Sequence, residues 1–294
     1  MSASALAPRL AAYFRLIRFQ HTLFALPFAY VGALLAAEGW PGWATLAWVT
    51  LALVGARTTA MALNRVIDAR LDALNPRTAA REIPAGVIAP NAALVLALAG
   101  FVAFVVAGSA LNALTLALLP VATAFLVLYP YTKRFTWGCH AFLGITIGAA
   151  AAGGWIAFRG TFDPAAWWLW LAVAAWIAGF DVIYALLDER FDREHGVHSV
   201  PARFGATRAR QLAALAHAVA WIAFAVAAWV TGQGPIGWAG LGLVGALFGY
   251  QHVLVARRGA AEALRAFDAN LWVGALVLLS VALDLAWRVG SVGG

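Results

Sequence analysis

The sequence contains few charged residues and a single cysteine. Asp, Glu, Lys and Arg make up 11% of the 294 residues, whereas typical soluble domains carry about 25%. This scarcity excludes an ordinary soluble domain. Because Cys139 is the only cysteine, an internal disulfide and a thiolate metal cluster are excluded as well.

Apolar residues are correspondingly abundant: hydrophobic side chains make up 64% of the chain, and its mean hydropathy is +0.83. The hydrocarbon core of a bilayer requires roughly 20 consecutive apolar residues per helix. The stretches of this chain that are apolar and long enough fill most of its length and leave no room for a separate soluble domain. We therefore expect one all-α, polytopic transmembrane domain over residues 1–294. Nine windows meet the requirement, near 19–37, 43–66, 91–110, 112–129, 140–158, 165–187, 210–231, 236–256 and 269–288.

The formal net charge of +7 raises the possibility of a nucleic-acid partner, but the placement of the charge argues against it. If the N-terminus is cytoplasmic, 17 of the 20 Lys and Arg residues fall in segments on that side of the membrane. This asymmetry follows the positive-inside rule. We therefore expect an integral protein of the cytoplasmic (inner) membrane, with its N-terminus and charged connections in the cytoplasm and no nucleic-acid partner.

A short polar motif occurs twice, each time where an apolar window ends. The segment DARLD (68–72) matches DERFD (188–192), 120 residues later. Internal duplication is common in membrane proteins that have a central site between two halves. The repeat therefore indicates a site to which two parts of the chain contribute.

Helical spacing places the polar residues of each motif on one face. Positions four apart differ by about 40° around a helix, so Asn64, Asp68 and Asp72 share a face, which Arg57 extends into the membrane. A second face is predicted at the other motif, formed by Asp181, Tyr184, Asp188 and Asp192. Each polar face then descends from the cytoplasmic surface into the bilayer.

Carboxylates at the C-terminal end of a helix are disfavoured by the helix dipole, by about 0.3–1 kcal/mol each. Neighbouring arginines that neutralise a solvated face are one remedy, and divalent cations are another. A solvated face explains neither the repetition of the motif nor the depth of Asp181 and Arg57, where a charge costs about 2.5–3.5 kcal/mol on insertion scales. We therefore favour a functional site.

Carboxylates without His or Cys suit hard cations, and Mg²⁺ is often held by one or two carboxylates together with the phosphates of a substrate. Lys133 and Arg134, in YPYTKRF (129–135), add positive charge on the same side of the membrane. The two motifs therefore predict a magnesium–diphosphate site. Because this site lies at the mouth of a hydrophobic bundle, the other end of the diphosphate substrate is expected to be a lipid tail.

The two motifs, N-x-x-x-D-x-x-x-D from Asn64 and D-x-x-Y-A-x-x-D-x-x-x-D from Asp181, resemble those of the UbiA superfamily of intramembrane prenyltransferases. Segments 15–37 and 62–86 are most similar to the 4-hydroxybenzoate polyprenyltransferase-like branch. The resemblance covers nearly the whole chain. It implies nine transmembrane helices around a central cavity that opens laterally to lipid, with motifs at 64–72 and 181–192 that bind Mg²⁺ and diphosphate.

The resemblance also implies a reaction, in which a polyprenyl group moves from its diphosphate to 4-hydroxybenzoate or a hydroxynaphthoate in ubiquinone or menaquinone biosynthesis. Nothing in the sequence indicates an obligatory protein partner. The expected metal ligands are Asp68, Asp72, Asp188 and Asp192, and the expected diphosphate-binding residues are Asn64, Lys133 and Arg134.

The remaining expected roles concern the aromatic acceptor. Asp181 orients its phenol or accepts a proton, with help from Tyr184. Arg57 or Arg18 binds its carboxylate, because guanidinium groups hold carboxylates through two hydrogen bonds. Alternatively, Arg57 is a buried partner of Asp181 or Asp68.

Two other classes of function compete with this interpretation. The chain is a superfamily transferase with another donor or acceptor, such as haem, dihydroxynaphthoate or phosphoribosyl diphosphate, or it is a transporter with intramembrane cation or proton sites. The transporter is disfavoured because most of the carboxylates are expected at one membrane surface rather than near the midplane.

Overall fold

The computed structural model describes residues 3–18 and 22–292, and within these ranges every regular element is a helix. Two of the elements, η2 and η3, are single 3-10 turns. In chain order the elements are α1 (Ala3–Leu16), α2 (Thr22–Ala37), α3 (Trp43–Ile67), α4 (Ala69–Leu74), α5 (Pro90–Leu111), α6 (Ala113–Thr132), α7 (Cys139–Arg159), α8 (Pro164–Ala185), η2 (Leu186–Asp188), α9 (Glu189–Glu194), α10 (Val200–Val230), α11 (Pro235–Arg258), η3 (Ala260–Glu262) and α12 (Ala263–Val292).

Within the described residues, eight helical segments are long and apolar enough to cross a membrane. Each covers one of the nine predicted windows, and the 16-residue helix α2 covers the remaining one, 19–37, whose residues 19–21 lie outside the described part. The all-α, polytopic class is confirmed. Helix α10 begins ten residues before its window because Ser199 caps it by accepting a hydrogen bond from the Ala202 amide, and hydropathy does not detect a cap.

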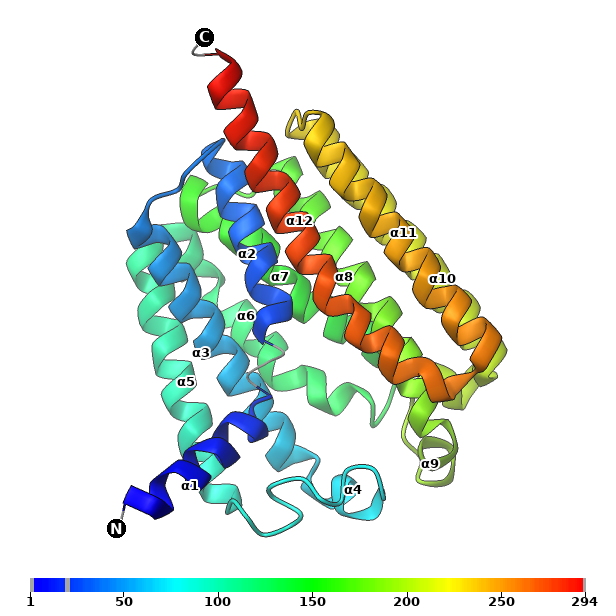
Figure 1. Cartoon of the computed structure of the whole chain (residues 1–294). Helices are drawn as coiled ribbons and strands as arrows, with labels where there is room; N and C mark the ends of the chain where they lie inside the picture. The colour runs from blue at the N-terminus through cyan, green and yellow to red at the C-terminus, as the bar shows by residue number, and fades with distance from the viewer. Residues whose placement is uncertain (1–2, 19–21, 293–294) are drawn as a thin grey trace.

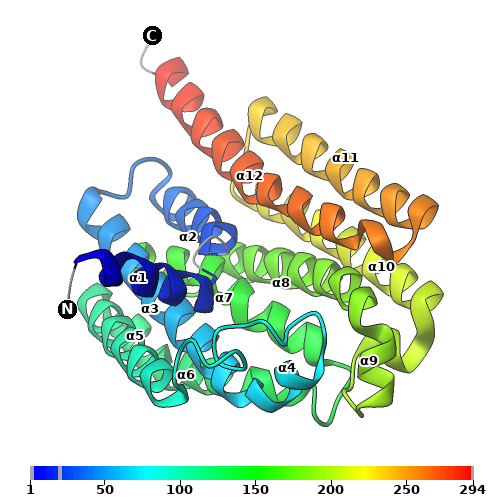
Figure 2. The same cartoon turned by 60° about the horizontal axis from the view of Figure 1, so that its bottom comes forward.

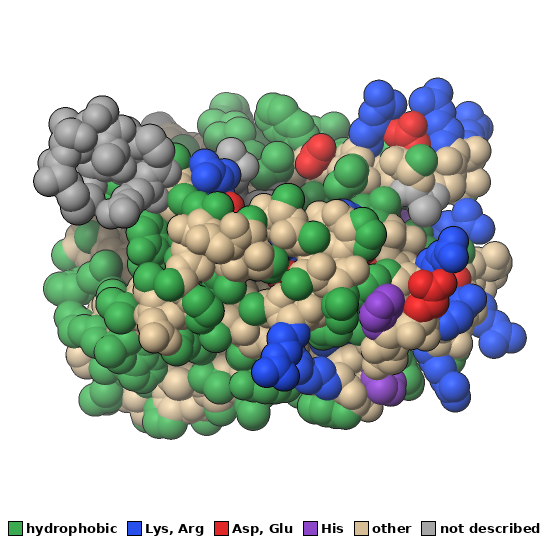
Figure 3. Space-filling model, turned by 90° about the horizontal axis from the view of Figure 1, so that it is seen from below, with side chains coloured by type: hydrophobic (Ala, Val, Ile, Leu, Met, Phe, Trp, Pro, Cys, Tyr) green, Lys and Arg blue, Asp and Glu red, His purple; other side chains and the backbone are tan. Residues whose placement is uncertain are grey.

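The helices form a bundle in which α2 and α7 are central (Figures 1 and 2). Helix α2 contacts α3, α7 and α12, while α7 contacts α6 and α8 in addition. Helices α1, α4 and α9 lie at one end of the bundle (Figure 1). Figure 3 looks onto that end and shows Lys and Arg side chains gathered along one side of it. The charged connections of the sequence therefore lie together.

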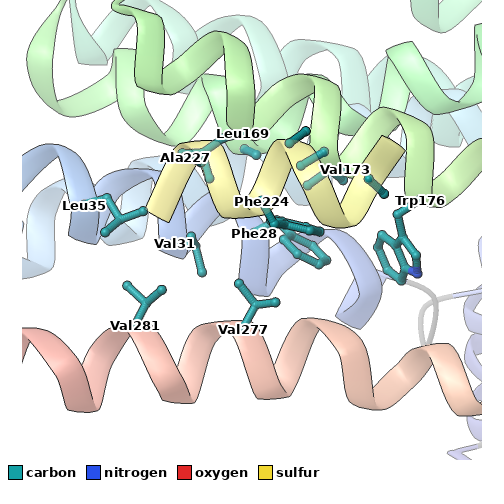
Figure 4. Packing of buried hydrophobic residues seen from close by; sticks show 14 of the residues in the cluster. Phe28, Val31, Leu35, Leu169, Val173, Trp176, Phe224, Ala227, Val277 and Val281 are labelled. Carbon is teal, nitrogen blue, oxygen red and sulfur yellow. The ribbon is translucent and has the colours of Figure 1, made fainter. Parts of the chain in front are cut away.

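The hydrophobic core is built where α2, α8, α10 and α12 meet (Figure 4). The Phe28 ring lies 5.0 Å from that of Trp176 and 5.9 Å from that of Phe224, measured between ring centroids. Val277 of α12 closes the same cluster (Figure 4). This core fixes α8, the helix that leads into the second aspartate motif.

Small residues allow α7 to approach its neighbours closely. A Cβ atom on Gly148 would lie 2.8 Å from the Ala174 amide nitrogen of α8, and one on Gly154 would lie 1.9 Å from the Ala29 carbonyl oxygen of α2. Small residues at helix interfaces are a common packing device in membrane proteins. The glycine-rich and alanine-rich segment 144–154 therefore serves close packing, as its composition predicts.

Gly154→Ala should destabilise the protein by about 1–3 kcal/mol or more, because the added methyl group meets backbone atoms that cannot move aside easily. Gly153→Ala is the matched control, since a Cβ there meets nothing within 4 Å and alanine favours helix by up to about 1 kcal/mol. Thermal unfolding in detergent should show a lower Tm for the first variant alone. Equal Tm values for the two variants would contradict this packing.

Candidate active site

Both aspartate motifs lie at breaks in a helix. Helix α3 ends at Ile67, Asp68 has φ −92° and ψ 1°, and the six-residue helix α4 follows. Helix α8 ends at Ala185, Asp188 has φ −109° and ψ 4°, and the six-residue helix α9 follows. The repeat noticed in the sequence is therefore also a repeat of local structure.

The expectation of one uninterrupted helical face through each motif is wrong. An anion in the last turn of a helix is disfavoured by the dipole, whereas an anion in the first turn is favoured. The breaks place Asp72 in the first turn of α4 and Asp192 in the first turn of α9. Because α4 and α9 have only six residues each, Asp72 and Asp192 lie within one turn of both helix ends, and the dipole does not clearly favour them. The breaks place the first aspartate of each motif between two helices and the second within the short helix that follows.

Asp68 is almost fully buried and is surrounded by donors. It accepts hydrogen bonds from Asn64 Nδ2 at 2.9 Å, from Arg134 Nη2 at 3.3 Å and from Lys133 Nζ. Lys133 caps the C-terminal end of α6. The basic segment after α6 and the first motif therefore form one cluster, as the sequence suggested.

Asp72 and Asp188 are each held by an arginine of the segment that follows the first motif. Arg81 Nη1 donates to both carboxylate oxygens of Asp72, at 2.7 and 2.8 Å. Arg77 pairs with Asp188, and Asn75 Nδ2 donates to the same carboxylate at 2.9 Å. The segment after the first motif thus binds the second motif directly.

Arg77 also donates to the hydroxyl oxygen of Tyr184 at 2.6 Å, and its guanidinium lies 5.0 Å from the centroid of that ring. Burial lowers the pKa of Arg77, but the hydrogen bond and the charge of Asp188 outweigh burial, and the pKa lies above its ordinary value. Arg77 is therefore a permanent cation at the junction of the two motifs.

Asp181 has an unexpected partner. The His140 Nδ1 atom of α7 lies 2.6 Å from Asp181 Oδ2, and His140 is buried. The alternative role of Arg57 as an ion-pair partner of Asp181 or Asp68 is not found, since Arg57 makes no ion pair within the described ranges. Its Nε atom is buried without a hydrogen-bond partner.

These side chains line one cavity of about 320 Å³, which is bounded by α3, α6, α7, α8 and Phe267 of α12. Arg134 reaches the site through Asp68 rather than by lining the cavity. The predicted site residues that line it are Arg18, Arg57, Asn64, Asp68, Asp72, Lys133, Asp181, Tyr184, Asp188 and Asp192. The structure therefore brings the predicted set together, and the role of each residue stays a prediction.

A second cavity of about 240 Å³ adjoins the first, with Arg57, Tyr129, Leu143 and Ile147 lining both. Its other lining side chains come from α2, α3, α5, α6, α7, α8 and the connection before α8, and almost all are aliphatic or aromatic. The site thus combines a charged chamber with an apolar one.

The donor set suits a hard divalent cation, since four carboxylates of the two motifs line the charged chamber. In the part of the chain that the structure describes, no three His, Cys, Asp or Glu side chains come close enough together to hold a metal ion. Asp68, Asp72 and Asp188 are paired with Lys or Arg instead. The arginines and lysine would have to move to a bound anion before these carboxylates could act as ligands.

Sequence reasoning missed Asn75, Arg77, Arg81 and His140. The first three lie in the connection after α4, whose unusual length and charge were the available signal. His140 lies at the edge of an apolar window, and a single histidine there has no spacing to other polar residues from which a role could be predicted.

The comparisons with known proteins agree with this geometry. A model of the UbiA prenyltransferase family matches residues 25–274. The 4-hydroxybenzoate octaprenyltransferase of Janthinobacterium sp. (strain Marseille) is 33% identical over 293 residues, which cover 95% of this chain and 99% of that protein.

Solved structures show the same fold. The apo structure of a UbiA homolog from Aeropyrum pernix K1 superposes with a TM-score of 0.83 at 32% identity, covering 90% of this chain and 98% of that one. A UbiA homolog from Archaeoglobus fulgidus, bound to GPP and Mg²⁺, has a TM-score of 0.69 at 17% identity, covering 92% and 99%. This chain is thus a multi-pass integral membrane protein and belongs to the UbiA prenyltransferase family.

Proposed function

We propose that this protein transfers a polyprenyl group from a polyprenyl diphosphate to a hydroxylated aromatic acid, 4-hydroxybenzoate or a hydroxynaphthoate, in quinone biosynthesis. The observation that carries the proposal is the joining of two aspartate motifs and their cations to an apolar chamber. The name of the Janthinobacterium relative supports it. So does the binding of GPP and Mg²⁺ by the A. fulgidus homolog.

The diphosphate of the donor binds in the charged chamber. Lys133, Arg134, Arg77 and Arg81 already converge there on Asp68, Asp72 and Asp188. When the diphosphate enters, these cations turn to its oxygens, because phosphate is a strong acceptor for them. Asp68, Asp72, Asp188 and Asp192 would then be available to hold Mg²⁺, and the metal would stabilise the charge that develops on the leaving diphosphate.

The prenyl chain occupies the apolar chamber, whose lining has few polar side chains that could bind a charged group. Burying apolar surface there contributes roughly 25 cal/mol per Å². Since the two chambers meet at Arg57 and Tyr129, the reactive allylic carbon is held near that junction. The charged end of the bundle faces the cytoplasm of the inner membrane, consistent with the distribution of Lys and Arg.

The aromatic acid binds between Arg57 and Asp181. Arg57 supplies a buried cation without an ion-pair partner in the described chain, and a carboxylate would satisfy its Nε–H. The allylic C–O bond breaks, and its electron pair leaves with the diphosphate. A ring carbon ortho to the hydroxyl forms the new C–C bond, and its proton passes to Asp181, assisted by Tyr184.

An acceptor panel tests this function. The purified protein in lipid vesicles, given one labelled polyprenyl diphosphate and Mg²⁺, should prenylate 4-hydroxybenzoate or a hydroxynaphthoate but not phenol, which lacks the carboxylate. Excess EDTA should abolish the product. Transfer only to haem, use of phosphoribosyl diphosphate as the donor, or ion transport without any donor would contradict the proposal.

A further inference from the structure

His140 connects three helices at the edge of the charged chamber. It lies in the first turn of α7, it is 5% exposed, and both of its ring nitrogens have partners. Nδ1 lies 2.6 Å from Asp181 Oδ2 of α8, and Nε2 lies 3.2 Å from the backbone nitrogen of Val200 at the start of α10. The ring therefore bridges a cavity carboxylate and a helix terminus.

The Val200 contact fixes the direction of both hydrogen bonds. A backbone N–H can only donate, so the Nε2 atom of His140 must accept with its lone pair. In a neutral imidazole the proton is then on Nδ1. His140 therefore donates from Nδ1 to Asp181, which receives the bond as a carboxylate.

This arrangement distinguishes Asp181 from three of the four motif aspartates. Asp68, Asp72 and Asp188 are each paired with a Lys or Arg, whereas Asp181 contacts no Lys or Arg as an ion pair within the described residues and lies against His140 instead. A guanidinium neutralises a carboxylate and makes it a poor proton acceptor. The imidazole N–H instead orients the carboxylate through one hydrogen bond.

We propose that His140 is a positioning residue for prenyl transfer: it holds the Asp181 carboxylate oriented to accept the proton that the aromatic ring loses. The inference rests on the proposed function, in which Asp181 is the base. His140 lies at the edge of the charged chamber and acts on the reaction through Asp181. Its bond to Val200 keeps the ring in the tautomer that this role requires.

Two further hydrogen bonds connect the surroundings of His140 to the diphosphate site. The His198 amide donates to the Lys133 carbonyl oxygen at 2.7 Å, and Cys139 Sγ donates to the His198 carbonyl oxygen at 3.3 Å. The segment after the second motif is thus joined to the α6–α7 connection, which carries Lys133. His140 extends this joint to Asp181.

Two substitutions separate a positioning role from simple packing. In His140→Gln the amide oxygen can accept from Val200 and the amide nitrogen can donate to Asp181, so both hydrogen bonds are retained. In His140→Leu neither is possible. We expect kcat for the aromatic acid to fall by roughly 10²-fold or more in the Leu variant, the usual contribution of a positioned base. The Gln variant should stay within about tenfold of wild type, and KM for the prenyl diphosphate should be unchanged in both.

A double-mutant cycle completes the test. In an Asp181→Asn background, adding His140→Leu should lower kcat by less than about a further twofold, because the two residues act as one unit.

If the His140→Leu variant does not fold, His140→Asn replaces it, since the shorter amide side chain of asparagine cannot reach both Val200 and Asp181. Wild-type kcat in the Leu or Asn variant, equal losses in the Gln and Leu variants, or additive losses in the cycle would overturn the role of His140 alone. Absence of transfer by the wild-type protein would overturn the proposed function and this inference together.

Discussion

Replacing Asp68 or Asp188 with asparagine should lower Mg²⁺-dependent prenyl transfer by about 10³-fold or more, while the protein stays folded in membranes. Each substitution removes one negative charge from the set of carboxylates proposed to hold the metal, and metal stabilisation of a leaving group contributes several kcal/mol. Asparagine keeps the size of the side chain and an acceptor oxygen for the neighbouring Lys and Arg residues. The loss therefore comes from the missing charge rather than from a cavity.

Turnover of a labelled prenyl diphosphate by purified variants in vesicles measures this effect, with Tm recorded to show that each variant is folded. Glu194→Gln is the matched control, because Glu194 lies two residues after Asp192 but is exposed and pairs with Arg190 on the surface of α9. Its turnover should equal that of the wild type. Unchanged turnover in either asparagine variant would exclude the two motifs as the metal–diphosphate site.

Replacing Arg57 with methionine should have two effects of opposite sign. The acceptor KM should rise by about 10²-fold, because a charge-assisted pair with the carboxylate of the aromatic acid is lost. At the same time Tm should rise, because a buried guanidinium with an unpartnered Nε atom is removed. A charge at that depth costs about 2.5–3.5 kcal/mol on insertion scales.

Arg57→Lys is the control that keeps the charge and removes the planar pair of donors. It should bind the acceptor weakly without the gain in Tm. Steady-state kinetics with acceptors that carry or lack the carboxylate, together with thermal unfolding, separate the two effects. An unchanged acceptor KM in the methionine variant would show that Arg57 does not bind the carboxylate.

The helices of the bundle were predictable from sequence, because hydropathy directly identifies the apolar segments that are long enough to span a membrane. All eight long helical segments of the described chain coincide with predicted windows. The breaks at Asp68 and Asp188 were not predictable from periodicity, which assumes that a helix continues until a proline or glycine ends it. At these two positions the aspartates pair with Lys133 and Arg77, which come from other parts of the chain and are not described by periodicity.

The sequence predicts which residues lie at the site better than it predicts which of them contact one another. Helical spacing correctly places Arg57 and Asp181 at the same cavity as the motifs. The partner of Asp181 is nevertheless His140, because the contact joins α7 to α8 and depends on how closely these helices pack. The ion pairs of Arg77 and Arg81 likewise depend on the path of a long connection. The sequence shows that this connection is charged, but it has no helical periodicity from which the positions of its side chains could be predicted.

The central claim is that both motifs together hold one metal–diphosphate group. The most direct measurement is the binding of a non-reactive prenyl thiodiphosphate to the wild-type protein in vesicles across a Mg²⁺ titration, followed by structure determination of the complex. The account predicts Mg²⁺-dependent binding, with the diphosphate between residues 68–72 and 188–192 and in contact with Lys133 and Arg77. Tight binding that is independent of Mg²⁺, or a diphosphate bound away from both motifs, would contradict it.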